Sequence, residues 1–400
     1  MTTDKSDGLI YMDHAATTAV ESRVIEAMLP FFGQQFGNPS SIYTFAQTAA
    51  HAVDAPRDEV APGLNARNSE VVFTSGGAES DNTALRSAAF ALRDHGDHIV
   101  TTAIEHHAVL HACEWLEDLG FRITYLKPDG DGFVSADQVS AAITERTTVV
   151  SVMYANNEIG VIEPLGDISR SVSAKAAEFR HPIVFHTDAV QAAGWLPLDV
   201  DALGVDMLSL SAHKFNGPKG VGVLYTRHGA PFAAQAMGGS QERNRRAGTE
   251  NTPGIVGTGL ALEIAESARI ESLEGDDSVL RMRDRLIEAI TAIPKTRLNG
   301  PRAEGRLPNN VNFSFAGVEA ESLLVNLDFA GVAASSGSAC TSGSIDPSHV
   351  LLALGLRQDM ARNSLRLTLG RENKESDVDR LIKVLPPIVE RVRRLAGPGR

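Results

Sequence analysis

The residues with the clearest chemical potential lie in 205–222, where an apolar run ends at Ser211, His213 and Lys214 and a Gly/Pro-rich turn follows. Lysines normally lie on solvated surfaces, because burying an unpaired ammonium group is costly. A lysine at a strand end, beside a hydroxyl and an imidazole, suits an amine that loses its proton and acts as a nucleophile. This chemistry indicates a Schiff base to pyridoxal phosphate. A solvated lysine before a hairpin turn explains this stretch equally well when it is taken alone.

A second polar segment, residues 75–80, follows the short apolar run 71–74 and precedes an apolar helical pattern that ends near Leu92. The segment contains Gly76 and Gly77. A strand, a glycine turn and a helix start place free backbone N–H groups and the positive end of the helix dipole at one point, which favours anion binding. A two-glycine turn by itself is weak evidence, because many strand–helix joints need one.

Strand-like runs alternate with helical patterns from residue 70 onward, which predicts an α/β fold with a mostly parallel, doubly wound sheet. In such sheets ligands gather beyond the carboxyl ends of the strands, where the polar clusters fall. The expected helices end near Leu92 and Leu119, begin at Ser135 and cover residues 165–179. The expected strands are residues 71–74, 98–102, 121–126, 148–154, 183–186, 207–210 and 221–225.

The two ends of the chain are predicted to differ from this regular pattern. Residues 240–249 form a basic loop, and a long helical region at 253–293 is expected to lead into a second domain. In that second domain we expect strands at 310–315, 331–334 and 365–369 and helices at 319–327 and 375–395. Near the N-terminus we expect helices at 21–32 and 45–60, separated by a turn at 37–41.

Composition narrows the class of protein. A chain of 400 residues with 43% hydrophobic and 22% charged residues is typical of a soluble globular protein with two domains. A net charge of −13 argues against a nucleic-acid binder or an anionic-membrane binder. No signal peptide or membrane-spanning run is apparent, so we expect a cytoplasmic protein. Two cysteines, Cys113 and Cys340, exclude a disulfide scaffold and give no zinc-site spacing.

Eight motifs, in this order, resemble those of the cysteine desulfurases, pyridoxal-phosphate enzymes of the class V aminotransferase fold. The resemblance extends from Tyr11 to the terminal helix. It implies a fold type I transferase with a seven-stranded sheet and a smaller α+β domain. The implied large domain is 16–260; the small domain is 1–15 plus 261–400 and carries a mobile cysteine loop at about 333–345. The motifs are residues 13–18, 37–41, 74–82, 105–110, 156–160, 188–191, 211–214 and 335–342.

The resemblance implies a role for each residue around the cofactor ring. Lys214 would form the Schiff base and then move the Cα proton of the substrate as base and acid. Asp188 would pair with the pyridinium nitrogen, although a strand-end aspartate that caps a turn is the simpler alternative. His106 would stack on the ring and handle protons, while the adjacent His107 is expected to be structural. Asn157 and Gln191 would contact the phenolic oxygen.

The cofactor phosphate would bind at the glycine turn. The resemblance places it on the backbone N–H groups of Gly77 and Ala78, with Ser211 and His213 adding side-chain donors. Many relatives have a threonine where Ala78 stands, and its hydroxyl binds the phosphate. Thr249 would reach the phosphate of the partner subunit, which implies a homodimer.

Three residues are implied in binding the substrate, L-cysteine. Arg366 would clamp its carboxylate, although the sequence alone reads as a strand arginine with an ion-pair partner. Asn38 would lie near the same carboxylate, and Asn157 would also contact the substrate.

Cys340 is the predicted nucleophile, because its Ser/Gly-rich setting favours an exposed loop. Its thiolate would take the substrate sulfur, leaving L-alanine and a persulfide. An acceptor such as an iron–sulfur scaffold or a tRNA-thiolation enzyme would then receive the sulfur, and Cys340 is a candidate for a transient iron–sulfur ligand shared with a scaffold. Cys113 falls in an amphipathic helical pattern and is expected to be a buried packing thiol.

The sequence is also compatible with two other functions. The first is a selenocysteine lyase or another class V lyase or aminotransferase, although a plain aminotransferase has no need of Cys340. The second is a non-catalytic scaffold for sulfur trafficking, which the presence of Lys214, Asp188 and His106 argues against.

Overall fold

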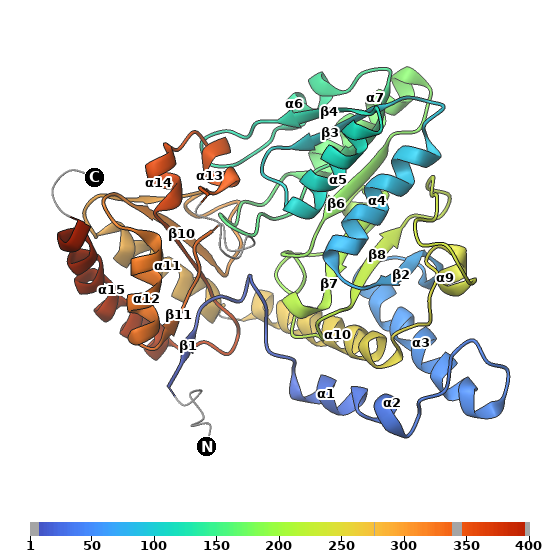
Figure 1. Ribbon diagram of the computed structural model, residues 1–400, viewed down its shortest axis with the longest axis horizontal. Helices are drawn as coiled ribbons and strands as arrows, with labels where there is room; N and C mark the ends of the chain where they lie inside the picture. Colours follow the sequence, from blue (N-terminus) through green and yellow to red (C-terminus); the bar gives the residue numbers. More distant parts are fainter. Residues whose placement is uncertain (1–7, 276, 338–345, 397–400) are drawn as a thin grey trace.

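A seven-stranded sheet forms the larger part of the protein, whose computed structural model describes residues 8–275, 277–337 and 346–396 (Figure 1). Its strand order is β2-β8-β7-β6-β5-β3-β4. Neighbours from β7 to β4 are parallel, whereas β8 is antiparallel to both β2 and β7. The predicted mostly parallel α/β sheet is therefore confirmed. The strands are β2 (Val71–Thr74), β3 (His98–Thr102), β4 (Arg122–Leu126), β5 (Thr147–Ser151), β6 (Val184–Asp188), β7 (Met207–Ser211) and β8 (Gly222–Thr226).

Helices cover both faces of this sheet, which explains why every strand but the edge strand β4 is buried at each residue. Such strands have continuous apolar runs instead of alternating patterns. The covering helices are α4 (Gly77–Ala91), α5 (His107–Asp118), α6 (Ala136–Ala142), α7 (Leu165–Phe179), α8 (Val200–Leu203) and α10 (Thr252–Glu274).

The N-terminal helices lie along α10 at one edge of the molecule (Figure 1). They are α1 (Ser22–Met28), α2 (Pro30–Gly33) and α3 (Thr44–Gly63). The single helix expected at 21–32 is divided in two, because Pro30 has no N–H group to continue the first helix and instead begins the second.

The helical region expected at 253–293 is also two helices, α10 and α11 (Ser278–Thr291). The backbone is extended at Gly275, where α10 ends. Asp277 then begins α11, since its carboxylate accepts a hydrogen bond from the N–H of Leu280.

A smaller unit contains a three-stranded sheet of order β12-β10-β9 and a two-stranded parallel sheet of β1 with β11. Its strands are β1 (Ile10–Tyr11), β9 (Thr296–Leu298), β10 (Asn310–Phe315), β11 (Val332–Ala333) and β12 (Ser364–Thr368). Its helices are α11, α12 (Ala320–Phe329), α13 (His349–Ala353), α14 (Gln358–Arg362) and α15 (Glu375–Ala396). The segment labelled α9 (Gln241–Asn244) lies in the basic loop and is a turn with Glu242 and Arg243 at positive φ.

Each unit has an apolar core, and a further buried cluster joins residues 104–161 of the larger unit to residues 350–361 of the smaller one. One core of the large sheet joins residues between Val24 and Leu262, whereas Ile10 and Met12 pack with residues between Val279 and Val392. The start of the chain thus packs with its C-terminal part, as Figure 1 shows for β1 beside β11. Ala261 and Leu262 of α10 still pack in the core of the large sheet, so the domain boundaries at residues 16 and 261 stay a prediction.

None of the helices within the described residues is long and apolar enough to cross a membrane.

Candidate active site

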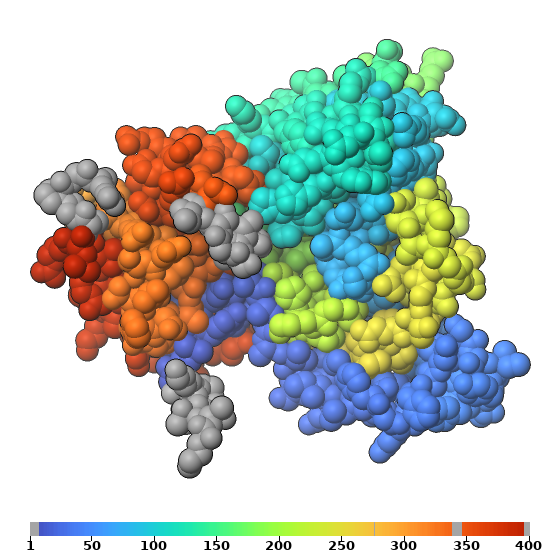
Figure 2. All heavy atoms as spheres, viewed as in Figure 1, coloured from blue at the N-terminus to red at the C-terminus, as the bar shows by residue number. Residues whose placement is uncertain are grey.

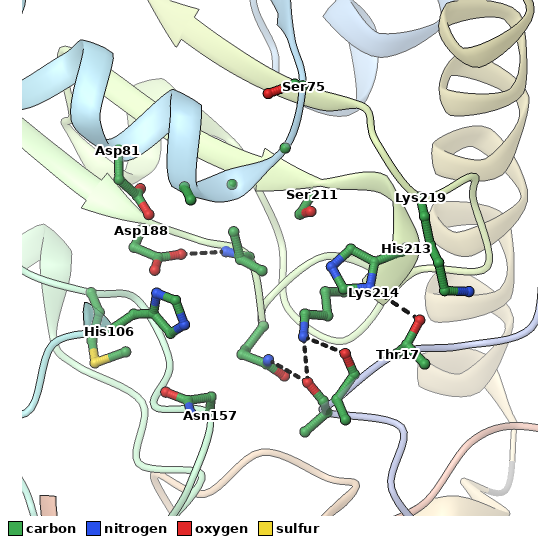
Figure 3. Close-up of a pocket in the computed structure, with 18 of the residues that line it drawn as sticks. Thr17, Ser75, Asp81, His106, Asn157, Asp188, Ser211, His213, Lys214 and Lys219 are labelled. Carbon is green, nitrogen blue, oxygen red and sulfur yellow. Dashed lines mark hydrogen bonds between the residues drawn. The ribbon is translucent and has the colours of Figure 1, made fainter. Parts of the chain in front are cut away.

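A cavity of about 630 Å³ opens at the carboxyl end of the parallel strands (Figure 3). Its walls come from the large sheet, from residues 15–17 and from β12. It brings together residues separated by up to 351 positions in the chain, from Ala15 to Arg366. Ten of the predicted site residues line it: Gly77, Ala78, His106, Asn157, Asp188, Gln191, Ser211, His213, Lys214 and Arg366.

The N-terminus of α4 forms one end of this cavity. Among the described residues no side chain caps this helix, so its first N–H groups remain available. Gly76 has a φ of 155°, and a Cβ at Gly77 would lie 2.8 Å from Cγ2 of Val190. Glycine is therefore required where the backbone turns beside Ser211. These free N–H groups, together with the helix dipole, make an anion site.

Lys214 lies at the end of the 3₁₀ turn Ala212–Lys214, which directly follows β7. Its ammonium group points into the cavity and donates to the carbonyl oxygens of Ala15 and Ala16, at 2.6 and 2.8 Å. Gln191 donates to the same Ala15 oxygen at 3.1 Å. The lysine is therefore partly enclosed at the strand end and is not the solvated residue of the alternative reading.

Asp188 is buried at the end of β6 and faces the cavity. Burial raises the pKa of its carboxyl to about 6, while the Val190 N–H and the charge of Lys214 act in the opposite direction. The Val190 N–H donates to Oδ1 at 2.9 Å. A buried carboxylate of this kind is suited to bind a cationic group of a ligand.

His106 precedes α5 and caps it, because its Nδ1 accepts a hydrogen bond from the N–H of Ala108 at 3.1 Å. This bond places the proton of the neutral ring on Nε2. Burial, followed by the charge of Lys214, lowers the pKa of His106 to about 4. The ring is therefore neutral near pH 7 and presents a flat face and one N–H donor to the cavity.

Arg366 lies on β12 and enters the cavity from the smaller unit. It donates to Oδ1 of Asp13 at 2.8 Å and to the carbonyl oxygen of Asn157 at 3.0 Å. Its buried Nε has no hydrogen-bond partner among the described residues. The ion pair with Asp13 agrees with the simpler sequence reading, and the unpaired Nε leaves a donor for an anionic ligand.

Two predicted site residues, Asn38 and Thr249, are not brought to this cavity. Asn38 is exposed, and its side chain accepts from the Ser40 N–H at 2.9 Å, so it stabilises its own turn. Thr249 is exposed at the end of the basic loop. Neither residue is among those that line the cavity. Cys340 lies outside the described residues.

Cys113 and His107, which the sequence predicts to be structural, pack against other residues. Cys113 is fully buried on α5, and burial raises the pKa of its thiol strongly, so it is not a nucleophile at neutral pH. His107 packs against His111 and His349, with ring centroids 5.0 and 4.6 Å away.

Several residues at the cavity had no role assigned from the sequence: Thr17, Ser75 and Asp81, which lie within the motifs, and Lys219. Asp81 follows Gly77 by four positions on α4, so helical periodicity could have placed it on the same face. Thr17 hydrogen-bonds Nδ1 of His213 at 3.1 Å, a contact across 196 positions that no local pattern signals.

The sequence model of the family described as aminotransferase class V matches residues 10–381. Among curated proteins, the cysteine desulfurase IscS of Methanosarcina thermophila is 51% identical over 387 residues, which cover 97% of this chain and 93% of that protein. The cysteine desulfurase IscS of Clostridium botulinum strain Hall is 50% identical over 390 residues, covering 97% of this chain and 96% of that protein.

Solved structures agree in fold. A NifS-like protein superposes with a TM-score of 0.88 and 35% identity, covering 96% of this chain and 99% of that one. A structure described as SspA in complex with cysteine superposes with a TM-score of 0.77 and 36% identity, covering 90% of this chain and 98% of that one.

Proposed function

This chain belongs to the class V aminotransferase family and, within it, to the cysteine desulfurases, and from that membership we propose that it converts L-cysteine to L-alanine with pyridoxal phosphate as cofactor. One observation of the structure carries the proposal. Lys214, Asp188 and His106 meet in one cavity that ends at the uncapped N-terminus of α4. An amine, a buried carboxylate and a neutral imidazole around an anion site are the groups this chemistry needs.

The polar groups that line the cavity fit pyridoxal phosphate. The N–H groups of Gly77 and Ala78, with Ser211 and His213, would hold the phosphate. The buried Asp188 would hold the protonated ring nitrogen, and the flat ring of His106 would cover the pyridine. Asn157 and Gln191 would face the phenolic oxygen. When bound, the cofactor supplies an electron-accepting ring that stabilises negative charge at the Cα of an amino acid.

Other steps would be carried out by residues of the chain, which move a proton and bind the substrate. Lys214 would attach to the cofactor, and after the substrate displaces it, its amine would take and return the Cα proton. Arg366 would bind the substrate carboxylate with its free Nε as well as with the groups that now contact Asp13. Asn157, whose carbonyl already accepts from Arg366, would also contact the substrate.

Cys340 would receive the sulfur. Its thiolate would form an S–S bond with the substrate sulfur while the C–S bond of the substrate breaks, which leaves alanine and a Cys340 persulfide. We infer that the acceptor of this sulfur is a protein of iron–sulfur assembly or tRNA thiolation, and that the enzyme works in the cytoplasm.

A single assay tests the proposed function. Alanine and sulfide are measured together from L-cysteine in the presence of a thiol reductant, with the visible absorption of the bound cofactor recorded in parallel. We expect alanine and sulfide in equal amounts. No alanine from L-cysteine, with turnover of selenocysteine alone, would contradict this proposal and favour a selenocysteine lyase.

We infer a homodimer, because one edge of the chain exposes a dense apolar surface. Large apolar side chains within residues 25–45 of the α1–α3 segment are exposed, and the exposed fraction of Ile42 is 95%. This segment forms a lower edge of the molecule in Figure 2. Exposed apolar patches of this kind mark association surfaces. The other members of the patch are Ile25, Leu29, Phe32, Phe36, Tyr43 and Phe45.

Ile42→Asp is expected to weaken this dimer at least tenfold, because a charge would be desolvated at the interface. Light scattering over a concentration series measures the dissociation. The matched control is Phe329→Asp on α12, since Phe329 is also highly exposed (84%) but lies on the other unit. Equal effects of the two substitutions would contradict the assignment of the interface.

Ala78→Thr is expected to tighten the binding of pyridoxal phosphate. Ala78 is exposed in the first turn of α4, so there is room for a larger side chain. An added hydroxyl bond to the charged phosphate is worth roughly 1.5–3 kcal/mol, or about tenfold or more in affinity. Titration of the apo-protein followed by absorbance gives the dissociation constants. Ala78→Val has a similar shape without the hydroxyl and is the control; equal affinities of all three proteins would refute the prediction.

A further inference from the structure

Asp81 is a buried carboxylate at the cavity for which the proposed mechanism has no role. It lies on α4 and is 1% exposed. Figure 3 shows its carboxylate pointing from the helix toward Asp188 and His106. A carboxylate oxygen of Asp81, a carboxylate oxygen of Asp188 and a ring nitrogen of His106 all lie within 4.8 Å of one another.

Two buried carboxylates at this separation cannot both carry a charge at low cost, so the pair retains a proton. Asp188 is the better anion of the two. Its Oδ1 accepts the N–H of Val190, and the charge of Lys214 favours its ionised form. Oδ1 of Asp81 has no hydrogen-bond partner among the described residues. Burial, followed by the charge of Asp188, raises the pKa of Asp81 well above its usual value, although a hydrogen bond with Ser209 acts in the opposite direction. The retained proton therefore belongs on Asp81.

The alternative is that Asp81 is an anion paired with His186, whose Nε2 lies 3.6 Å from Oδ1. His186 is completely buried on β6, and both ring nitrogens already contact hydroxyls, of Ser151 at 2.9 Å and Ser209 at 3.0 Å. Burial lowers the pKa of His186 to about 3, so the ring is neutral. A neutral imidazole gives Asp81 no compensating charge.

We propose that Asp81 is a positioning residue that stays protonated beside Asp188 and thereby keeps Asp188 ionised for the ring nitrogen of the bound cofactor. The inference rests on the proposed function. A protonated carboxyl is a hydrogen-bond donor, and a donor beside a carboxylate stabilises the charged form. Asp81 is therefore expected to act through Asp188, without itself touching the reacting atoms.

The first test measures the stability of the full-length apo-protein against pH. The groups that face Asp81 are Asp188 and His186 on β6, Ser209 on β7, and Glu105 and His106 before α5. If the pKa of Asp81 is raised on folding, its protonated form stabilises the folded state below about pH 4, and this contribution is lost as the pH rises toward the folded pKa.

Asp81→Asn removes this titration, so the ratio of its folding constant to that of wild type should increase with pH. The increase should approach about tenfold per pH unit over part of the range from pH 4.5 to 8. Asp137→Asn is the matched control, because Asp137 is exposed on α6 and does not line the cavity. An ion pair with His186 would instead make Asp81→Asn destabilising without such an increase, and that result would overturn the proposal.

The second test measures the affinity of the apo-protein for pyridoxal phosphate at pH 8. Asn retains a neutral donor, so Asp81→Asn should bind within about threefold of wild type, whereas Asp81→Leu should bind at least about tenfold more weakly. The proposal would be overturned if Asp81→Asn and Asp81→Leu weakened the binding of pyridoxal phosphate equally, or if Asp81→Leu bound it with full affinity. If Asp81→Leu does not fold, the affinity of Asp81→Asn decides the test. If the wild-type chain binds no pyridoxal phosphate, the proposed function is overturned as well. If it binds pyridoxal phosphate normally but the ratio of the two folding constants does not change with pH, this inference alone is overturned.

Discussion

Cys340→Ser is expected to abolish the release of sulfide from L-cysteine, by more than about a thousandfold, while the visible absorption of the bound cofactor is retained. A serine hydroxyl is not ionised at neutral pH and cannot accept sulfur as a persulfide. The cofactor is proposed to be held by other residues, among them Lys214, Asp188 and His106, which line the cavity. Sulfide assays together with the absorption spectrum separate loss of sulfur transfer from loss of the cofactor.

Cys113→Ser is the matched control, since Cys113 is the other cysteine of the chain. Its side chain is fully buried on α5, so the substitution is expected to lower stability while leaving sulfur transfer per folded molecule near wild type. Mass spectrometry after brief incubation with L-cysteine should show one added sulfur atom in Cys113→Ser and none in Cys340→Ser. An added sulfur atom in Cys340→Ser would contradict the role of Cys340.

Lys214→Ala is expected to reduce alanine formation by about 10²–10⁴-fold through the loss of acid–base catalysis alone, and further through the loss of covalent attachment. The side chain also joins β7 to the N-terminal segment, because its ammonium donates to the carbonyl oxygens of Ala15 and Ala16. The visible band of the protein-linked cofactor should disappear. Rapid-mixing measurements of alanine, with the spectrum of each sample, check both effects.

Lys219→Ala is the control for this substitution. Lys219 also lines the cavity, but it is exposed in the turn that follows Gly217. Its loss should leave the visible band in place and reduce alanine formation far less than Lys214→Ala. If both lysine substitutions removed the band equally, covalent attachment could not be assigned to Lys214.

Patterns within single segments were enough to predict most of the regular structure. Buried runs such as residues 71–74 and 98–102 were found where the structure has β2 and β3, because strands covered on both faces are apolar throughout. The helix at 165–179 also has the predicted bounds. Helix breaks were less evident: Pro30 begins a second helix, and the break at Gly275 lies inside a pattern that reads as continuous.

The sequence by itself determined the class of chemistry, because Lys214, the glycine turn before α4 and the order of the motifs are local features that need no neighbours to be read. The tertiary structure alone decided which groups share the cavity and which of them are protonated. Arg366 meets Asp13 across 353 positions, and Asp81 meets Asp188 only because α4 packs against the end of β6. Charge, burial and proton affinity depend on distances through space, and side chains far apart in the chain set these distances only when the sheet and its helices pack together.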